Sequence, residues 1–163
     1  MCMGKNIIAL VCIIILVIFL LTACTGVQAP SREDVQEHFD NNKSNIQIVT
    51  DFLTTSGYEN VYIDTTDGYM LADLRQIRIG DDAVVHAIKQ LLSHNAYLSI
   101  TKTGNTIYLL QWKSSKDVGC GVAFSVDNES MPEIEFATQL DALADGGWYY
   151  YVSDYNKWRT LHS

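Results

Sequence analysis

Hydrophobic residues are distributed along this chain in three distinct patterns. A continuous apolar run extends from Ile7 to Leu21. Between residues 31 and 55, apolar residues recur every three or four positions, the spacing of an amphipathic helix, and a second such stretch follows Asp81. From Tyr97 onward, short alternating stretches separated by turn residues are typical of strands.

The first helix is predicted to begin at Ser31 as its N-cap, with Asp34 three residues later in a capping-box position. The polar run Asn41–Asn45 weakens the middle of this helix and could mark a break, and Gly57 is expected to end it. The expected buried stripe consists of Val35, Phe39, Ile46, Val49, Phe52 and Leu53.

The second helix is predicted to be capped by Asp81 and to end at Asn95. Short connections between the strands favour an antiparallel meander. We therefore predict an α+β fold, an antiparallel β-meander sheet of about five to seven strands with two helices packed on one face. A cystatin-like or NTF2-like arrangement would accommodate this order, but no motif selects either. The expected strands are Val61–Ile63, Tyr69–Leu71, Tyr97–Thr101, Thr106–Trp112, Gly119–Val126, Glu133–Leu140 and Trp148–Ser153.

The N-terminal apolar run follows a basic residue, Lys5, and leads to Leu21-Thr22-Ala23-Cys24. This order is typical of a secretory signal peptide. As a helix the run would span roughly 23–26 Å, short of the ~30 Å hydrocarbon core of a bilayer. An uncleaved membrane helix and ordinary secretion are the alternatives.

Leu21-Thr22-Ala23-Cys24 also resembles the lipobox of bacterial lipoprotein precursors. The resemblance implies cleavage after Ala23 and a diacylglyceryl group on the sulfur of Cys24, which would become a membrane anchor facing outside the cytoplasm. Two acyl chains are enough for stable anchoring. The expected organisation is a cleaved signal peptide (1–23), a lipidated N-terminus with a short tether (24–30) and one extracytoplasmic α+β domain (31–163).

The chain is acidic, with 11 Lys and Arg against 19 Asp and Glu. Cleavage after Ala23 would remove only Lys5 from this balance and leave a net charge of −9. Nucleic-acid binding is therefore not expected, because it depends on basic residues that neutralise phosphates. Attraction to anionic lipid is not expected either, so the lipid on Cys24 would be the only membrane attachment.

Cys120 is the only thiol expected in the mature domain, because Cys2 and Cys12 leave with the signal peptide and Cys24 is modified. It lies between Gly119 and Gly121 in a predicted strand. We interpret it as a small apolar residue where a neighbouring group crowds the sheet. The alternative is a nucleophile activated by one of three histidines, His38, His86 or His94.

No metal site and no cofactor are predicted. His86 and His94 would lie about 12 Å apart along one helix, too far to share an ion. Asp34 and His38 have i,i+4 spacing but are interpreted as a surface pair. Glu133 and Glu135 are expected on one face of an edge strand, where a carboxylate pocket would require an enclosure that the sequence does not show.

Aromatic residues gather at the C-terminal end of the chain. On a strand, Trp148 and Tyr150 would point to one face and Tyr149 and Tyr151 to the other. The second face could be an exposed tyrosine surface; alternatively, the strand is central and buried on both faces. The possible binding surface comprises Trp148, Tyr149, Tyr151, Tyr155 and Trp158.

These observations favour a lipid-anchored domain that binds another envelope or exported protein and is not an enzyme. The first alternative is a small hydrolase or transferase that uses Cys120 or a carboxylate pocket. The second is a cell-wall glycan binder that uses the C-terminal aromatic residues.

Overall fold

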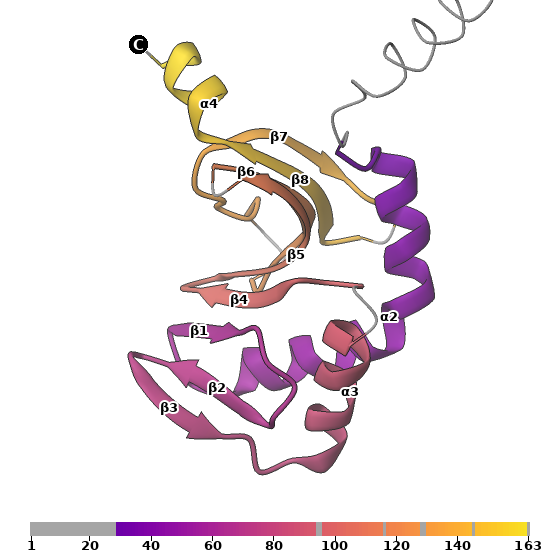
Figure 1. The fold of residues 1–163 in the computed structure, drawn as a ribbon, viewed down its shortest axis with the longest axis vertical. Helices are drawn as coiled ribbons and strands as arrows, with labels where there is room; N and C mark the ends of the chain where they lie inside the picture. The colour runs from indigo at the N-terminus through magenta and orange to yellow at the C-terminus, as the bar shows by residue number, and fades with distance from the viewer. Residues whose placement is uncertain (1–28, 94–95, 116, 128–129, 145, 163) are drawn as a thin grey trace, which may run out of the picture.

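The computed structural model describes residues 29–93, 96–115, 117–127, 130–144 and 146–162. The signal peptide, the lipobox and Cys24 lie outside the described residues. Within these ranges the chain forms three helices and eight strands (Figure 1). In chain order they are α2 (Arg32–Thr55), β1 (Asn60–Ile63), β2 (Tyr69–Ala72), β3 (Arg75–Arg78), α3 (Asp82–Ser93), β4 (Ser99–Thr103), β5 (Thr106–Ser115), β6 (Val118–Ser125), β7 (Ala137–Ala142), β8 (Trp148–Asp154) and α4 (Tyr155–Leu161).

The strands form one open antiparallel sheet in the order β3-β2-β1-β4-β5-β6-β8-β7. The α+β class and the antiparallel pairing are confirmed, but the predicted five to seven strands and two helices are too few. The additional elements are β3 and α4. In β3 only Ile77 is apolar, so the strand has no alternating pattern, and α4 has only seven residues.

The sheet is not a simple meander, because β8 lies between β6 and β7. The chain leaves β6, crosses to the outer edge of the sheet to form β7, and then returns as β8. The predicted strand Glu133–Leu140 is therefore wrong in its first half. Residues 133–136 belong to the crossing segment, and β7 begins only at Ala137.

The helix α2 begins as predicted, with the Ser31 and Asp34 side chains forming a capping box. Its polar middle does not break it, although Figure 1 shows that the helix changes direction about midway along its length. Asn42 Nδ2 donates a hydrogen bond to the His38 carbonyl at 2.8 Å. Such a side-chain bond competes with the main-chain ladder and is one recognised cause of helix bending.

The hydrophobic core lies between the sheet and one covering layer, formed by α2 and α3. Neither α2 nor α3 lies on the other face of the sheet. Lys102, only 7% exposed, donates from Nζ to the Leu53 carbonyl at 2.8 Å and so binds β4 to the last turn of α2. That turn contains no basic residue of its own. The largest fully buried side chains in this core include Phe39, Ile46, Leu53, Ile88, Leu91, Ile100, Ile107 and Leu109.

The beginning of α2 is fastened to the turn between β7 and β8. The Arg32 guanidinium donates to the Ala142 carbonyl, and the Ala144 N–H donates to Gln36 Oε1 at 2.9 Å. The Tyr150 hydroxyl donates to the Pro30 carbonyl at 3.2 Å. The described chain therefore starts at one end of the molecule, the end that also carries α4, while β1–β3 lie at the opposite end (Figure 1).

Candidate functional site

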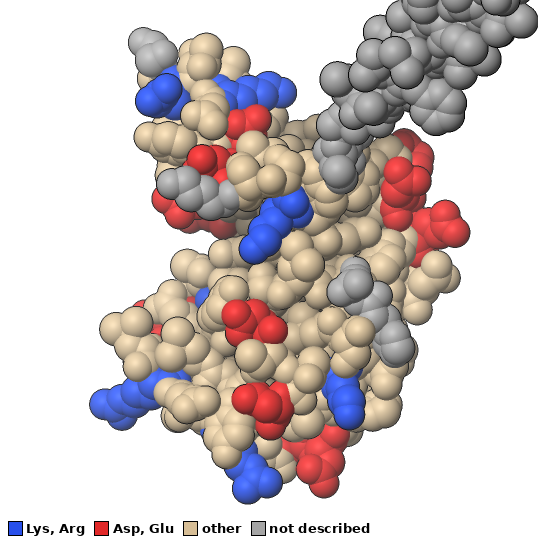
Figure 2. Space-filling model, in the orientation of Figure 1, with Lys and Arg blue, Asp and Glu red and all other residues tan. Residues whose placement is uncertain are grey.

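The helix-free face of the sheet is continuous across all eight strands, but its two halves differ. Register partners that share this face form one row from β3 to β7. We call the β5–β8 part the covered half and the β1–β3 part the open half. Figure 2 shows that the molecule is hollowed between them. The row consists of Gln76, Leu71, Tyr62, Thr101, Tyr108, Ala123, Tyr149 and Ala142.

The covered half lies beneath the chain segment that leads into β7. This segment is fixed to β5 at one end, where the Glu133 N–H donates to Thr106 Oγ1 at 2.9 Å. At its other end the Phe136 carbonyl accepts from the Asp154 N–H at 3.0 Å. Tyr151, which points to this face, is consequently only 2% exposed.

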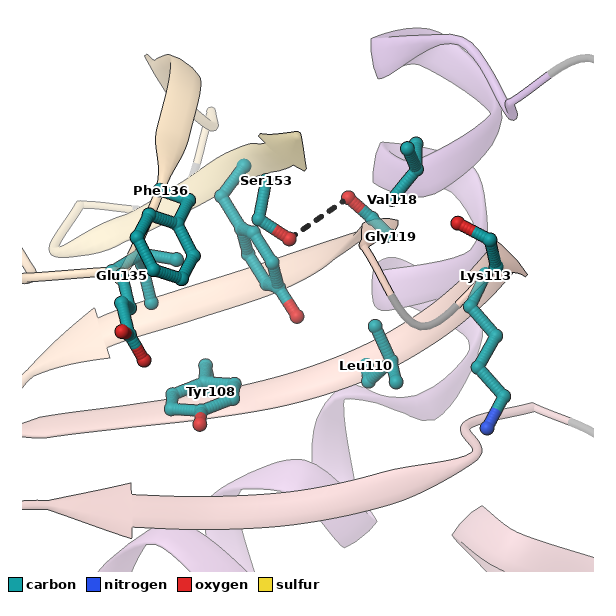
Figure 3. Close-up of a pocket in the computed structure, with 11 residues that line it drawn as sticks. Tyr108, Leu110, Lys113, Val118, Gly119, Glu135, Phe136 and Ser153 are labelled. Carbon is teal, nitrogen blue, oxygen red and sulfur yellow. Dashed lines mark hydrogen bonds between the residues drawn. The ribbon is translucent and has the colours of Figure 1, made fainter. Parts of the chain in front are cut away.

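A cavity of about 470 Å³ opens beside this segment (Figure 3). Its walls include the rings of Tyr108 and Phe136, with Lys113 and Glu135 toward opposite sides. The Tyr151 hydroxyl is buried without a hydrogen-bond partner among the described residues, and burial raises its pKa well above the usual value. A phenol in this state stays protonated at neutral pH and does not serve as a base.

Two glutamates line a second hollow of about 540 Å³ on the other side of the segment. Both Glu133 and Glu135 border it, together with Tyr108. Their side chains are exposed to solvent. The two acids are thus brought near one hollow, but neither is enclosed in the apolar surroundings that a glycosidase-type general acid uses.

The open half presents apolar side chains directly to solvent. Tyr62 and Leu71 are register partners on β1 and β2 and are 42% and 45% exposed. Leu74, at the tip of the β2–β3 hairpin, is 92% exposed. A small groove of about 130 Å³ separates this tip from β4. Exposed apolar patches of this kind mark interaction surfaces more often than single exposed apolar residues do.

The hairpin tip is held in an unfavourable backbone conformation. Asp73 and Leu74 have φ values of +44° and +66°, the left-handed region that a two-residue type I′ turn requires. Asparagine and glycine are preferred there, and a leucine costs of order 1 kcal/mol or more. Asp73 fixes the tip, because its carboxylate and its N–H both bond to the main chain of Asn60 at 2.9 Å.

The five aromatic residues proposed from the sequence do not form one exposed surface. Trp148 is 6% exposed and packs between Phe39 and Phe124 in the helix-covered core. Of the two alternatives left open for the other face of this strand, the structure shows burial: the crossing segment covers Tyr151, and Tyr149 is half-buried.

Tyr155 and Trp158 lie beyond β8, on the short helix α4. Their rings pack edge-on against Phe136, with centroids 4.9 and 5.3 Å away. The rings of Trp158 and His162 stack at 4.5 Å. These contacts leave no open row of coplanar rings at the positions proposed for glycan binding. Sequence reasoning missed Phe136, whose role depends on two elements that meet only in the folded chain.

Cys120 is fully buried on the helix-facing side of β6. Burial raises the pKa of its thiol to about 11, so a thiolate is disfavoured at neutral pH. His86 is exposed on α3, His38 packs against the Tyr97 ring, and His94 lies outside the described residues. The nucleophile hypothesis therefore lacks an accessible, activated sulfur.

The interpretation of the flanking glycines is confirmed. A Cβ atom at Gly121 would lie 2.0 Å from the Leu109 carbonyl oxygen, and one at Gly119 would lie 2.8 Å from Leu110 Cδ1. The crowding arises where β5 shifts register against β6, between Leu110 and Trp112.

Among the described residues, no group of three or more His, Cys, Asp or Glu side chains could hold a metal ion. No helix in the described part of the chain has the length and apolarity needed to cross a bilayer. Comparison with protein-family models, curated proteins and solved structures finds no match in any of the three.

Proposed function

We propose that this protein is a lipid-anchored, non-catalytic binding domain of the cell envelope, and that its open half contacts a partner protein. The first part of the proposal rests on the signal peptide and its lipobox-like end, Leu21-Thr22-Ala23-Cys24, with Cys24 as the lipidated residue. The hairpin tip carries the second part.

The decisive observation is Leu74. An exposed leucine in a left-handed conformation contributes little to folding and works against it, since glycine or asparagine would suit the turn better. Its position beside Tyr62 and Leu71 gives the residue a use in recognition. Aromatic and apolar residues at the centre of a patch supply most of the binding energy of protein interfaces.

The surroundings of the patch indicate the chemistry of the partner. The groove beside Leu74 can receive one small apolar side chain. Arg78, the register partner of Tyr69, lies exposed on the same face in the neighbouring edge strand β3. A partner protein that presents an apolar side chain flanked by acidic residues would match both features.

Site-specific crosslinking in intact cells tests this contact. A photo-crosslinking amino acid replaces Leu74 in the full-length chain, and matched probes replace two exposed apolar residues elsewhere, Ile48 on α2 and Met131 in the connection between β6 and β7. We expect a protein adduct at position 74 only. Leu71→Asp in the same chain should reduce the yield at least tenfold. Equal adducts at all three positions, or none, would contradict the proposal.

The anchor is tested separately by metabolic lipid labelling. We expect labelled fatty acid to be incorporated into the wild-type protein and to be absent from the Cys24→Ala variant. Label that persists in the variant would refute Cys24 as the attachment site without bearing on the open half.

The geometry supports the two alternatives less well. A hydrolase would have to work with a buried Cys120 or with two solvent-exposed glutamates. A glycan binder would have to use aromatic rings that pack against one another or in the core. Neither arrangement offers the exposed, convergent groups that the open half provides.

A further inference from the structure

We infer that α4 is a second membrane contact, which lies on the anionic bilayer surface and orients the domain so that its open half faces away from the membrane. The inference rests on the proposed lipid anchor at Cys24. It changes the expectation, drawn from the net charge alone, that the lipid is the only attachment.

The composition of α4 suits a bilayer interface. Its seven residues include Lys157 and Arg159 and contain no acid. Leu161 is 65% exposed, and Trp158 is half-buried at the helix surface. Tryptophan, cations and an exposed aliphatic residue are characteristic of segments that lie in the headgroup region.

The position of α4 suits the same role. Figure 1 shows α4 and the start of α2 at one end of the molecule, with β1–β3 at the other end. The six tether residues, Thr25 to Pro30, can extend no more than ~20 Å between a lipidated Cys24 and α2. The anchor therefore keeps this end of the domain, and α4 with it, within reach of the lipid headgroups.

The charges at this end are divided between the two helices. The first turn of α2 carries Glu33 and Asp34 next to Arg32, whose guanidinium bonds to the Ala142 carbonyl, whereas α4 itself carries Lys157 and Arg159 and no acid. Figure 2 shows the blue side chains of α4 with red ones directly below them. An anionic surface repels one side and attracts the other. The domain should therefore tilt until α4 touches the bilayer and the first turn of α2 is raised from it.

The rigid mounting of α4 makes this tilt effective. The N-cap carboxylate of Asp154 accepts from the Lys157 N–H at 2.9 Å, and Phe136 packs against both Tyr155 and Trp158. A helix held in this way cannot swing freely on the end of β8. Its contact with lipid consequently sets the direction of the whole sheet.

Quenching of Trp158 fluorescence by brominated lipid provides the test. The full lipidated chain is reconstituted in vesicles of phosphatidylcholine, with or without phosphatidylglycerol, and the Trp158 signal is obtained by subtraction of a Trp158→Phe variant. We expect quenching in the anionic vesicles. Two cations at a surface favour the docked orientation by roughly 30-fold, and 1 M salt should abolish the effect.

The variants separate a specific contact from a general effect of charge. K157E/R159E should lose the quenching, while R75E/R78E, the same change of charge at the opposite end, should retain it. Leu161→Asp should weaken quenching and Leu74→Asp should not. This second pair keeps the test decisive if the charge reversal disturbs folding.

Three results would overturn the inference. If the protein floats with vesicles in 1 M salt but Trp158 is not quenched in anionic vesicles at low salt, the anchor stands and the membrane role of α4 fails, as it would for a helix that docks another protein. If R75E/R78E loses as much quenching as K157E/R159E, the contact is not specific to α4. If the wild-type chain does not float at all, the lipid anchor and the role of α4 fail together.

Discussion

The two halves of the helix-free face share one sheet and one row of register partners, yet solvent reaches them very differently. In the covered half, Tyr151 is 2% exposed beneath the segment that leads into β7. In the open half, Tyr62 is 42% exposed and Leu71 45% exposed. Tyrosine thus acts as a core residue in one half and as a surface residue in the other. What decides its role is the path of the chain above it.

This contrast indicates where substitutions should affect folding and where they should affect recognition. Buried residues of the covered half, such as Tyr151, are enclosed by neighbouring side chains, so changes there should destabilise the fold. Open-half residues contact solvent on this face, so changes there should leave stability nearly unaltered and change binding. Four measurements test the division.

The largest effect is expected in the covered half at Gly121. Its Ala variant would place a Cβ atom 2.0 Å from the Leu109 carbonyl oxygen, so that β5 and β6 would have to separate. We expect Gly121→Ala to lower the free energy of unfolding by about 4 kcal/mol or to prevent folding. Gly80, next to β3, has no atom within 4 Å of its Cβ position, and Gly80→Ala should melt like the wild type.

Alkaline pH should lower the free energy of unfolding through the buried Cys120 thiol on β6. The folded-state pKa of the Cys120 thiol, about 11, lies above its ordinary value of 9.0, so folding favours the protonated form. The resulting stability, on the order of 2 kcal/mol, is complete below pH 9 and is lost as the pH rises through about 11. Urea unfolding between pH 8 and 11 should show a steep decline for the wild type and a flatter one for Cys120→Ala. Equal slopes would mean that the thiol is not buried as described.

Removal of the side-chain hydroxyl should change the free energy of unfolding differently at Tyr151 and at Tyr62. The buried Tyr151 hydroxyl has no hydrogen-bond partner among the described residues, so Tyr151→Phe should raise the unfolding free energy by about 1 kcal/mol. Tyr62→Phe, on the exposed half, should change it by much less. Thermal melts of the two variants make the comparison. A destabilised Tyr151→Phe would show that the hydroxyl has a partner in solution.

The smallest change in stability, with the sharpest functional consequence, is expected at the hairpin tip. Glycine adopts the φ of +66° without strain but loses more entropy on folding, so Leu74→Gly should stabilise the domain by only about 0.5 kcal/mol. Capture of the partner should nevertheless fall. The Leu74→Gly variant could melt at a higher temperature while a crosslinking probe at Tyr69 still captures the partner normally. In that case Leu74 does not belong to the proposed interface.

Local signals in the sequence predicted much of the fold. Ser31 and Asp81 cap helices because their side-chain oxygens bond within the next three residues, and no distant group is needed. Gly119 and Gly121 likewise indicated crowding correctly. The position of β7 at the outer edge depends instead on a crossing over the sheet that no short pattern describes.

The candidate site could not be predicted in the same way. Asp73-Leu74 lacks the Asn-Gly signature of the turn that it forms, so neither the hairpin nor β3 was expected. The C-terminal aromatic residues form a dense cluster in the sequence, but the sequence does not show what they pack against. Their packing against Phe136 and Phe39 became visible only when distant segments were brought together.

The fastening of α2 at both ends has a mechanical consequence. A pull on the proposed lipid tether would reach the domain at the start of this helix, where Tyr150, Arg32 and Gln36 hold it against the β7–β8 turn. The load would pass along α2 to Leu53, near the end of this 24-residue helix, where Lys102 transfers it to β4. Tension from a moving envelope would therefore be carried by the helical layer, and the exposed hairpin tip would keep its shape while the anchor is under strain.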